Sequence, residues 1–108
     1  MGYELYETEY RYRAWTKDGV WQDGALTTDK NITIHEGSNV FHYGQALFEG
    51  LKAYRTKDGH VQLFRPDMNF IRLNEGLRRL VAPQISEKLF YDSILQVVKA
   101  NEKDIPPY

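Results

Sequence analysis

The stretch LFEGLKAYRTKDGHVQLFRPD, residues 47–67, decides the fold, because it predicts a β-hairpin that leads directly into a helix. Residues 47–55 and 61–64 are rich in aliphatic and aromatic side chains, and an Asp-Gly turn sequence separates them. Pro66 suits the first turn of a helix, and Asp67 beside it favours the positive end of the helix dipole. We therefore expect two antiparallel strands followed by a helix.

Alternation along the first predicted strand sorts its side chains onto two faces. One face carries Phe48, Gly50, Lys52 and Tyr54, and the other carries Leu47, Glu49, Leu51 and Ala53. A glycine inside a strand weakens it, so Gly50 suggests close approach of a ligand, although a bulge or tight packing explains it equally well. Glu49 lies among leucines and should need a partner, such as an arginine, if it is buried.

Two helices are predicted after this hairpin. The first carries an apolar stripe and ends before Pro83; the stripe consists of Phe70, Leu73, Leu77 and Leu80. The second begins with Ser86 as N-cap, has Glu87 in its first turn and ends near Asn101. Its apolar stripe consists of Phe90, Ile94, Val97 and Val98.

The N-terminal part of the chain predicts further strands. Residues 10–15 alternate aromatic and basic side chains, and a turn at 17–19 precedes Val20 and Trp21, which indicates a second hairpin. Residues 32–34 could form another strand. Strands first and two helices last predict an α+β fold, with a largely antiparallel sheet of hairpins covered by the two C-terminal helices.

Composition excludes several classes of protein. The 108 residues are 42% hydrophobic and 27% charged, which is ordinary for one globular domain. A net charge of −1 gives no broad positive field, so we expect neither nucleic acid nor a membrane as partner. The sequence shows no membrane span or secretory signal and no cysteine, which predicts a cytoplasmic protein without disulfides or thiolate chemistry.

One arginine stands out as a candidate ligand-binding residue. Arg72 lies at the border of the first apolar stripe, and Gly76 one turn later has no side chain to obstruct an anion. A planar guanidinium can grip a phosphate in two places. An arginine lying over the edge of a core explains the same position, and three other arginines compete on charge alone: Arg65, Arg78 and Arg79.

Other reactive groups carry weaker signals. A desolvated Lys52 could form an imine with a carbonyl, but most strand lysines simply reach solvent. The three histidines have no metal-ligand spacing, and the residue order shows no Ser-His-Asp pattern.

The string FHYGQALFEGLKAYR, residues 41–55, closely resembles the small-domain signature of branched-chain amino acid aminotransferases. It is followed by VQLFRPD at 61–67 and then by Asn69, Arg72 and Leu73, which look like the arginine helix of that family. Residues 96–101 and 105–108 also fit, so the resemblance covers about residues 10–108.

The resemblance implies a transaminase of the D-alanine aminotransferase-like fold that uses pyridoxal 5′-phosphate and works as a homodimer with its sites between two domains. Such an enzyme would move the amino group between leucine, isoleucine or valine and 2-oxoglutarate. Arg72 would bind the cofactor phosphate. Phe48 and Gly50 would line the pocket for the apolar side chain of the substrate, and Tyr43 would reach the active site of the partner subunit.

The resemblance also implies that residues 1–108 form only the small N-terminal domain, truncated before the domain with the catalytic lysine. The imine-forming lysine, the carboxylate-binding loop and the acidic partner of the pyridine nitrogen all lie downstream in the family. We therefore expect no transaminase activity, and weak or absent cofactor binding, for these residues alone.

Some helix residues depart from the family pattern, and other functions remain as alternatives. Met68, Phe70 and Ile71 replace polar or small residues of close relatives, which predicts extra apolar surface on the helix. Within the same fold, a D-amino acid aminotransferase or an aminodeoxychorismate lyase is an alternative. A non-catalytic binding or dimerisation module is an alternative from another class.

Overall fold

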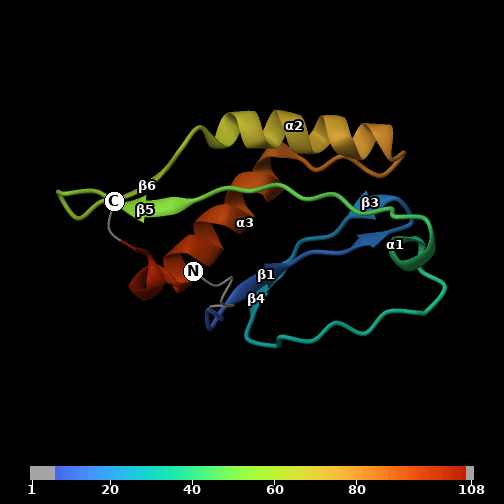
Figure 1. The fold of residues 1–108 in the computed structure, drawn as a ribbon, viewed down its shortest axis with the longest axis horizontal. Helices are drawn as coiled ribbons and strands as arrows, with labels where there is room; N and C mark the ends of the chain where they lie inside the picture. Colours follow the sequence, from blue (N-terminus) through green and yellow to red (C-terminus); the bar gives the residue numbers. More distant parts are fainter. Residues whose placement is uncertain (1–6, 107–108) are drawn as a thin grey trace, which may run out of the picture.

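The computed structural model describes residues 7–106, and its secondary structure confirms the predicted α+β class. Its strands form three separate antiparallel pairs rather than one continuous sheet. Helix α3 packs on β1 and β4, and α2 runs beside the extended chain that leads into β5, as Figure 1 shows. Pro107 and Tyr108, part of the family resemblance, lie outside the described residues.

The N-terminal hairpin is confirmed. Strand β1 (Arg11–Arg13) pairs with β4 (Ala25–Thr27), and β2 (Thr16–Lys17) pairs with β3 (Val20–Trp21). The tight turn between β2 and β3 places Asp18 at φ 52° and Gly19 at φ 78°. Two successive left-handed residues give a turn whose twist matches that of the flanking strands, which explains why an Asp-Gly pair occurs here.

The second predicted hairpin is confirmed only at its tip. Strand β5 (Ala53–Arg55) pairs with β6 (Val61–Leu63), and the turn between them has Gly59 at φ 85°. The prediction of a strand from residue 47 is wrong, because residues 47–52 join no ladder. These residues lie along helix α2 and are held there by side-chain contacts instead of strand pairing.

The strand suggested at residues 32–34 is not formed, and this expectation was wrong. Ile32 and Ile34 are 58% and 42% exposed, so no neighbouring layer buries them. In the preceding residues, backbone carbonyls accept hydrogen bonds from arginine side chains rather than from a strand. Arg11 donates to the carbonyl of Thr28, and Arg13 donates to that of Asn31, both at 3.0 Å.

The helices confirm the predicted boundaries. Helix α2 (Pro66–Arg79) starts at the predicted proline, and α3 (Glu87–Ala100) starts after Ser86, whose hydroxyl accepts a hydrogen bond from the backbone N–H of Leu89 at 3.1 Å. Asn101 is the C-cap of α3. A short helix α1 (Asn39–His42) and a 3₁₀ turn η1 (Glu102–Asp104) complete the described structure.

The elements are joined by a few well-defined contacts. Helix α3 packs on β1 and β4, and the rings of Phe70 and Phe90 join α2 to α3 with centroids 5.2 Å apart. The buried side chain of Asn101 bonds both backbone groups of Tyr10, at 2.8 and 3.0 Å. The Trp21 indole donates to the carbonyl of Pro83 at 3.0 Å and fixes the hairpin to the α2–α3 loop.

The core is small for a chain of this length. Among the described residues, Leu89 and Phe90 are the buried apolar side chains. Met68 and Ile71 are 48% and 56% exposed, which confirms the predicted apolar surface on α2, whereas Phe70 packs inward. Within residues 7–106, the longest apolar helical stretch is too short or too polar to cross a membrane.

Candidate functional site

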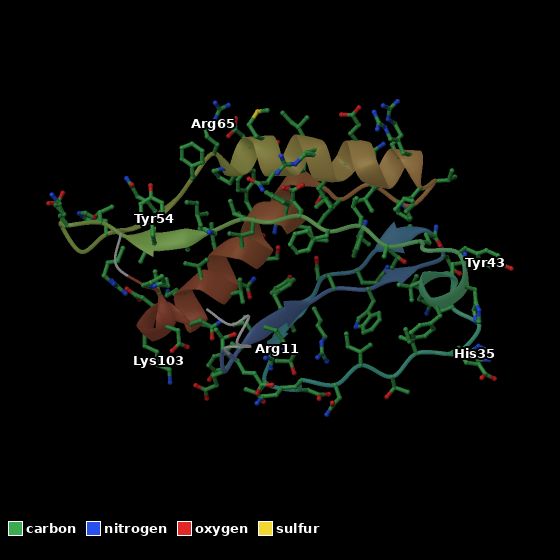
Figure 2. All side chains as sticks on the ribbon, viewed as in Figure 1. Arg11, His35, Tyr43, Tyr54, Arg65 and Lys103 are labelled. Atoms are coloured by element: carbon green, nitrogen blue, oxygen red, sulfur yellow. The ribbon has the colours of Figure 1, made fainter. Side chains whose placement is uncertain are left out.

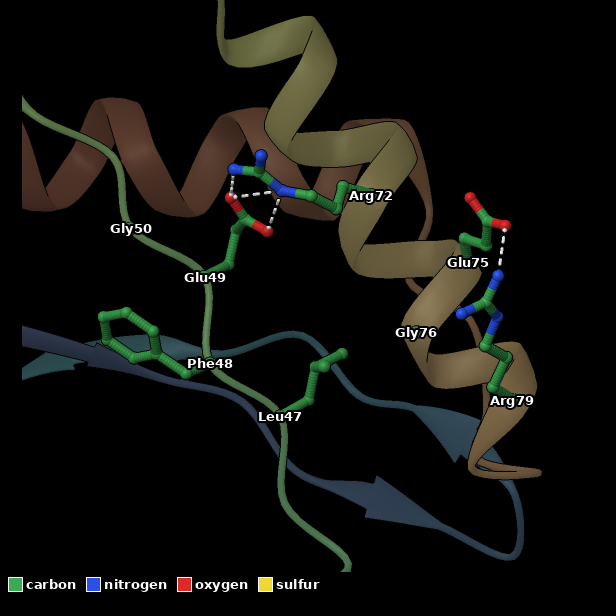
Figure 3. Close-up of a pocket in the computed structure, with 8 residues that line it drawn as sticks. All are labelled: Leu47, Phe48, Glu49, Gly50, Arg72, Glu75, Gly76 and Arg79. Atoms are coloured by element: carbon green, nitrogen blue, oxygen red, sulfur yellow. Dashed lines mark hydrogen bonds and ion pairs between the residues drawn. The ribbon is translucent and has the colours of Figure 1, made fainter.

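A cavity of about 480 Å³ lies between helix α2 and the extended residues 47–50 (Figure 3). Alternate side chains of the extended segment point to opposite sides, as period two predicts, so Leu47 and Glu49 face α2. The cavity is lined by Leu47, Phe48, Glu49, Gly50, Arg72, Glu75, Gly76 and Arg79. Its volume is within the range of small-molecule sites.

The strongest interaction in the cavity joins Arg72 to Glu49. The guanidinium meets the carboxylate side-on, since Nε donates to Oε2 at 2.8 Å and Nη2 donates to Oε1. The Arg72 side chain is 69% exposed, whereas that of Glu49 is only 13% exposed. The expectation that Glu49 needs an arginine partner is therefore confirmed, and the partner is Arg72.

Asn69, a second residue of α2, also hydrogen-bonds the Glu49 carboxylate. Asn69 is 6% exposed, and its side-chain Nδ2 donates to Glu49 Oε1 at 2.6 Å and to the carbonyl of Gly50 at 2.7 Å. One amide group thus fixes both the side chain of Glu49 and the backbone that follows it. These bonds replace the missing ladder and keep residues 49 and 50 beside α2.

The paired groups stay charged around neutral pH. The hydrogen bond from Arg72 holds the pKa of Glu49 below its ordinary value, and the bond from Asn69 acts in the same direction. Hydrogen bonding to Glu49 raises the pKa of Arg72. The other arginine of the cavity, Arg79, pairs with Glu75 at 3.1 Å, so the formal charges lining the cavity cancel.

The structure brings together three of the four residues predicted for the site. Phe48, Gly50 and Arg72 all line the cavity. Phe48 is 89% exposed, so its ring is available to a ligand. Tyr43 is not among the lining residues; it is 81% exposed and lies beyond α1, at the end of the molecule remote from β5 (Figure 2).

The two glycines of the cavity have different surroundings. A Cβ on Gly76 would lie 2.8 Å from Cδ2 of Leu47, so this glycine lets the Leu47 side chain pack closely on α2, and a larger residue would make that side chain shift. Gly76 also lines the cavity with Arg72, and the idea that it leaves room for an anion stays a prediction. A Cβ on Gly50 would meet only ring carbons of Phe48, at 3.7 and 3.8 Å, so no crowding explains the glycine there.

A second cavity of about 670 Å³ lies on the other side of Arg72. It shares Gly50 and Arg72 with the first, and its other lining residues are Leu51, Lys52, Phe64, Arg65, Met68 and Asn69. Lys52 therefore lies near Arg72 but lines a separate cavity from Phe48. Across residues 7–106, no cluster of His, Asp or Glu side chains is arranged to hold a metal ion.

Sequence reasoning missed the role of Asn69. Asparagine is uncommon in a helix interior because it competes for backbone hydrogen bonds, so its presence three residues before Arg72 was an available signal. The i, i+3 spacing places Asn69 and Arg72 on one face of α2, where both reach Glu49.

Comparison with known proteins finds similarity over the whole chain, although no protein-family model matches it. A branched-chain-amino-acid aminotransferase from Haemophilus influenzae is 48% identical over 108 residues, which are 100% of this chain and 32% of that protein. The corresponding protein from Helicobacter pylori is 44% identical over the same shares of the two chains. A methionine aminotransferase from Arabidopsis thaliana is 42% identical over 99% of this chain and 30% of its own length. The chain thus spans less than a third of these relatives.

Proposed function

We propose that this chain, which matches the N-terminal part of branched-chain-amino-acid aminotransferases along its whole length, is the small N-terminal domain of such a transaminase. Residues 1–108 would form that domain, and the catalytic lysine would belong to the remaining two thirds of the enzyme. Within the domain, Arg72 would bind the cofactor phosphate. Phe48 and Gly50 would contact the apolar substrate, and Tyr43 would act at the partner subunit's site in a homodimer.

The observation that carries this proposal is the position of Arg72. Its exposed side chain lines one cavity with the exposed ring of Phe48 and the uncrowded Gly50. The hydrogen bonds to Glu49 use Nε and Nη2, and within residues 7–106 they leave Nη1 unengaged. Two N–H groups at one edge of a guanidinium match two phosphate oxygens.

The described residues therefore fit the phosphate end of pyridoxal phosphate. When bound, this cofactor supplies the electron sink that allows an amino group to be exchanged for a keto oxygen. Arg72 would fix the phosphate, and Phe48 would exclude water from the substrate side chain. The residues that line the Phe48 cavity include no lysine, and Lys52 lines the second cavity at Arg72, so we expect residues 1–108 alone to form no covalent adduct in the Phe48 cavity.

An absorbance titration with pyridoxal phosphate tests the proposal. We expect residues 1–108 to bind the cofactor weakly, Arg72→Ala to abolish binding, and borohydride to trap no adduct. Arg65→Ala is the matched control, because Arg65 pairs with Asp67 at 3.1 Å and lies outside the Phe48 cavity. Equal binding by wild type and Arg72→Ala would refute the phosphate role, and a trapped adduct on Lys52 would refute the separation of that lysine from the site.

The substrate is best assigned on the complete enzyme. We propose transfer between leucine, isoleucine or valine and 2-oxoglutarate, in the cytoplasm and without a nucleic acid partner. A panel should add methionine, because one relative is named a methionine aminotransferase, and also D-alanine and aminodeoxychorismate, which represent the alternatives left open by the family resemblance. Turnover of D-alanine but not of the branched-chain amino acids would overturn the substrate class while leaving the cofactor site intact.

A non-catalytic interaction module is the second candidate function. It is favoured by the apolar side chains exposed on α1 and just after it, among them Phe41 at 61% and Tyr43 at 81%. If the module reading holds, residues 1–108 will form a stable dimer without cofactor, and Tyr43→Ser will dissociate that dimer in sedimentation experiments. A stable dimer that is unaffected by loss of Arg72 and binds no cofactor would favour this reading.

A further inference from the structure

We propose that Glu49, anchored by Asn69, is a positioning residue that holds the guanidinium of Arg72 with its outer edge free of the carboxylate. The inference rests on the proposed function, in which Arg72 binds the cofactor phosphate. It assigns a role to a carboxylate that would otherwise be an unexpected neighbour for a phosphate, since the two groups repel each other.

The anchor is rigid because it is buried. Asn69 is 6% exposed and donates both to Glu49 Oε1, at 2.6 Å, and to the carbonyl of Gly50, at 2.7 Å. The Glu49 carboxylate is tied to the helix that carries Arg72 and to its own backbone segment at the same time. With a side-chain exposure of only 13%, it has little freedom to turn toward solvent.

The geometry of the ion pair leaves one edge of Arg72 available. Glu49 accepts from Nε at 2.8 Å and from Nη2, which is the side-on arrangement. The remaining nitrogen points away from the carboxylate (Figure 3). A phosphate can therefore bond to the outer edge without displacing Glu49.

Two opposing effects decide the sign of the contribution of Glu49 to affinity. An arginine that is free to rotate loses side-chain entropy when it binds a ligand, which weakens binding by about tenfold. The negative charge of Glu49 weakens binding as well, but water and salt screen it at an arginine that is 69% exposed. Positioning should therefore outweigh repulsion, so that loss of Glu49 weakens phosphate binding.

The test measures pyridoxal phosphate affinity by absorbance, and inorganic phosphate affinity by competition, in the full-length protein that carries this chain. Glu49→Gln keeps the shape of the side chain but loses one acceptor for the side-on pair. We expect this substitution to lower the affinity for both ligands by about tenfold. Glu75→Gln is the matched control, because it removes the same charge from the same cavity, and the ion-pair partner of Glu75 is Arg79. It should bind both ligands as well as the wild type or slightly better.

A double-mutant cycle separates positioning from general loss of structure. In Arg72→Lys there is no side-on guanidinium edge for Glu49 to hold, so adding Glu49→Gln should cost little further affinity. If Glu49 merely supported the fold, the fold-losses of affinity in Arg72→Lys and in Glu49→Gln would multiply in the double variant. Asn69→Ala provides a second route to the same result, and it should weaken phosphate binding only when Arg72 is present.

Each result has a distinct meaning. Weaker binding by Glu49→Gln, an unaffected Glu75→Gln and non-additivity with Arg72→Lys would support positioning. Wild-type or tighter binding by Glu49→Gln would overturn it, as would losses that multiply in the cycle. If Arg72→Ala itself leaves both affinities unchanged, the proposed function fails, and the inference fails with it.

Discussion

At the scale of single residues, asparagine side chains on the helices hold segments that have no strand partner. Asn69 fixes residues 49 and 50, while Asn74 bonds both backbone groups of Ile85, at 2.8 and 2.9 Å. Asn101 does the same for Tyr10. A carboxamide has both a donor and an acceptor, so one side chain can satisfy the two backbone groups that a strand would otherwise bond.

The uncrowded position of Gly50 gives the first prediction. Gly50→Ala should change the free energy of unfolding by less than about 1 kcal/mol, because the new Cβ would make only ordinary contacts. If Gly50 lines the substrate pocket, the same change should raise the KM for leucine in the complete enzyme by about tenfold. The reason is that one additional methyl group in a hydrophobic pocket leaves less room for the substrate.

Gly59 is a control for Gly50, because its substitution should change stability and not the KM. It has φ 85°, so Gly59→Ala should destabilise the hairpin by about 1 kcal/mol and leave the KM for leucine unchanged. An unaltered KM in Gly50→Ala would show that no substrate group approaches this glycine closely. Urea unfolding and steady-state kinetics provide the two measurements.

The Glu49–Arg72 pair gives a prediction about pH. The folded pKa of Glu49 is lowered, chiefly by its hydrogen bond from Arg72, so the ionised carboxylate favours the folded state. Its contribution is complete above the unfolded pKa, about 4.3, and is lost as the pH falls through the lower folded value. The difference in unfolding free energy between wild type and Glu49→Gln should therefore shrink at acid pH.

Urea denaturation at a series of pH values between neutrality and strong acid measures this difference. In an Arg72→Ala background the largest cause of the lowered pKa of Glu49 is absent and only the bond from Asn69 still lowers it, so the pH dependence of the same comparison should be smaller. A difference that persists unchanged at the lowest pH would show that Glu49 contributes through packing and not through its charge.

At the scale of elements, local signals predicted the helices well, and non-local contacts decided the strands. The start of α2 at Pro66 and the Ser86 cap of α3 depend on neighbouring residues alone, and both are where the sequence places them. Residues 47–52 have strand composition, but a strand also needs a partner whose position the local sequence does not determine. The same dependence limits the prediction of the candidate site. The sequence indicated that Arg72 binds a ligand and that Glu49 needs an arginine partner, but it could not show that this partner is Arg72, 23 residues away.

The connection between α2 and α3 contains a strained residue that gives a prediction at this scale. Val81 has φ 55° and is 90% exposed, so a β-branched side chain occupies the left-handed region without packing in return. Val81→Gly should raise the free energy of unfolding by about 1 kcal/mol. Ala82→Gly, at the next position and without a positive φ, should lower it by about 0.5–1 kcal/mol. Loss of stability in both variants would show that the left-handed conformation carries no strain.

At the scale of the whole molecule, the described structure exposes more surface than a compact protein of its mass. Its accessible surface is 8849 Å², whereas a folded monomer of 12.7 kDa exposes about 6200 Å². Its radius of gyration is 15.4 Å, compared with about 13 Å for a compact domain of this length. The excess surface is partly apolar and includes side chains of the candidate site, which is what a lobe that packs against further protein would show.

The exposed apolar surface predicts that residues 1–108 alone will bind a hydrophobic dye and self-associate as concentration rises, because few apolar side chains are buried to offset chain entropy. Dye fluorescence and sedimentation velocity measure these two properties. The double variant Met68→Gln/Ile71→Gln changes side chains that are 48% and 56% exposed, so it should reduce both without loss of unfolding free energy. If residues 1–108 belong to a longer transaminase, as proposed, that longer protein should bind less dye per chain than residues 1–108 alone. A monomer without dye binding at every concentration would show that these side chains pack within the chain itself, and the domain would then be self-sufficient.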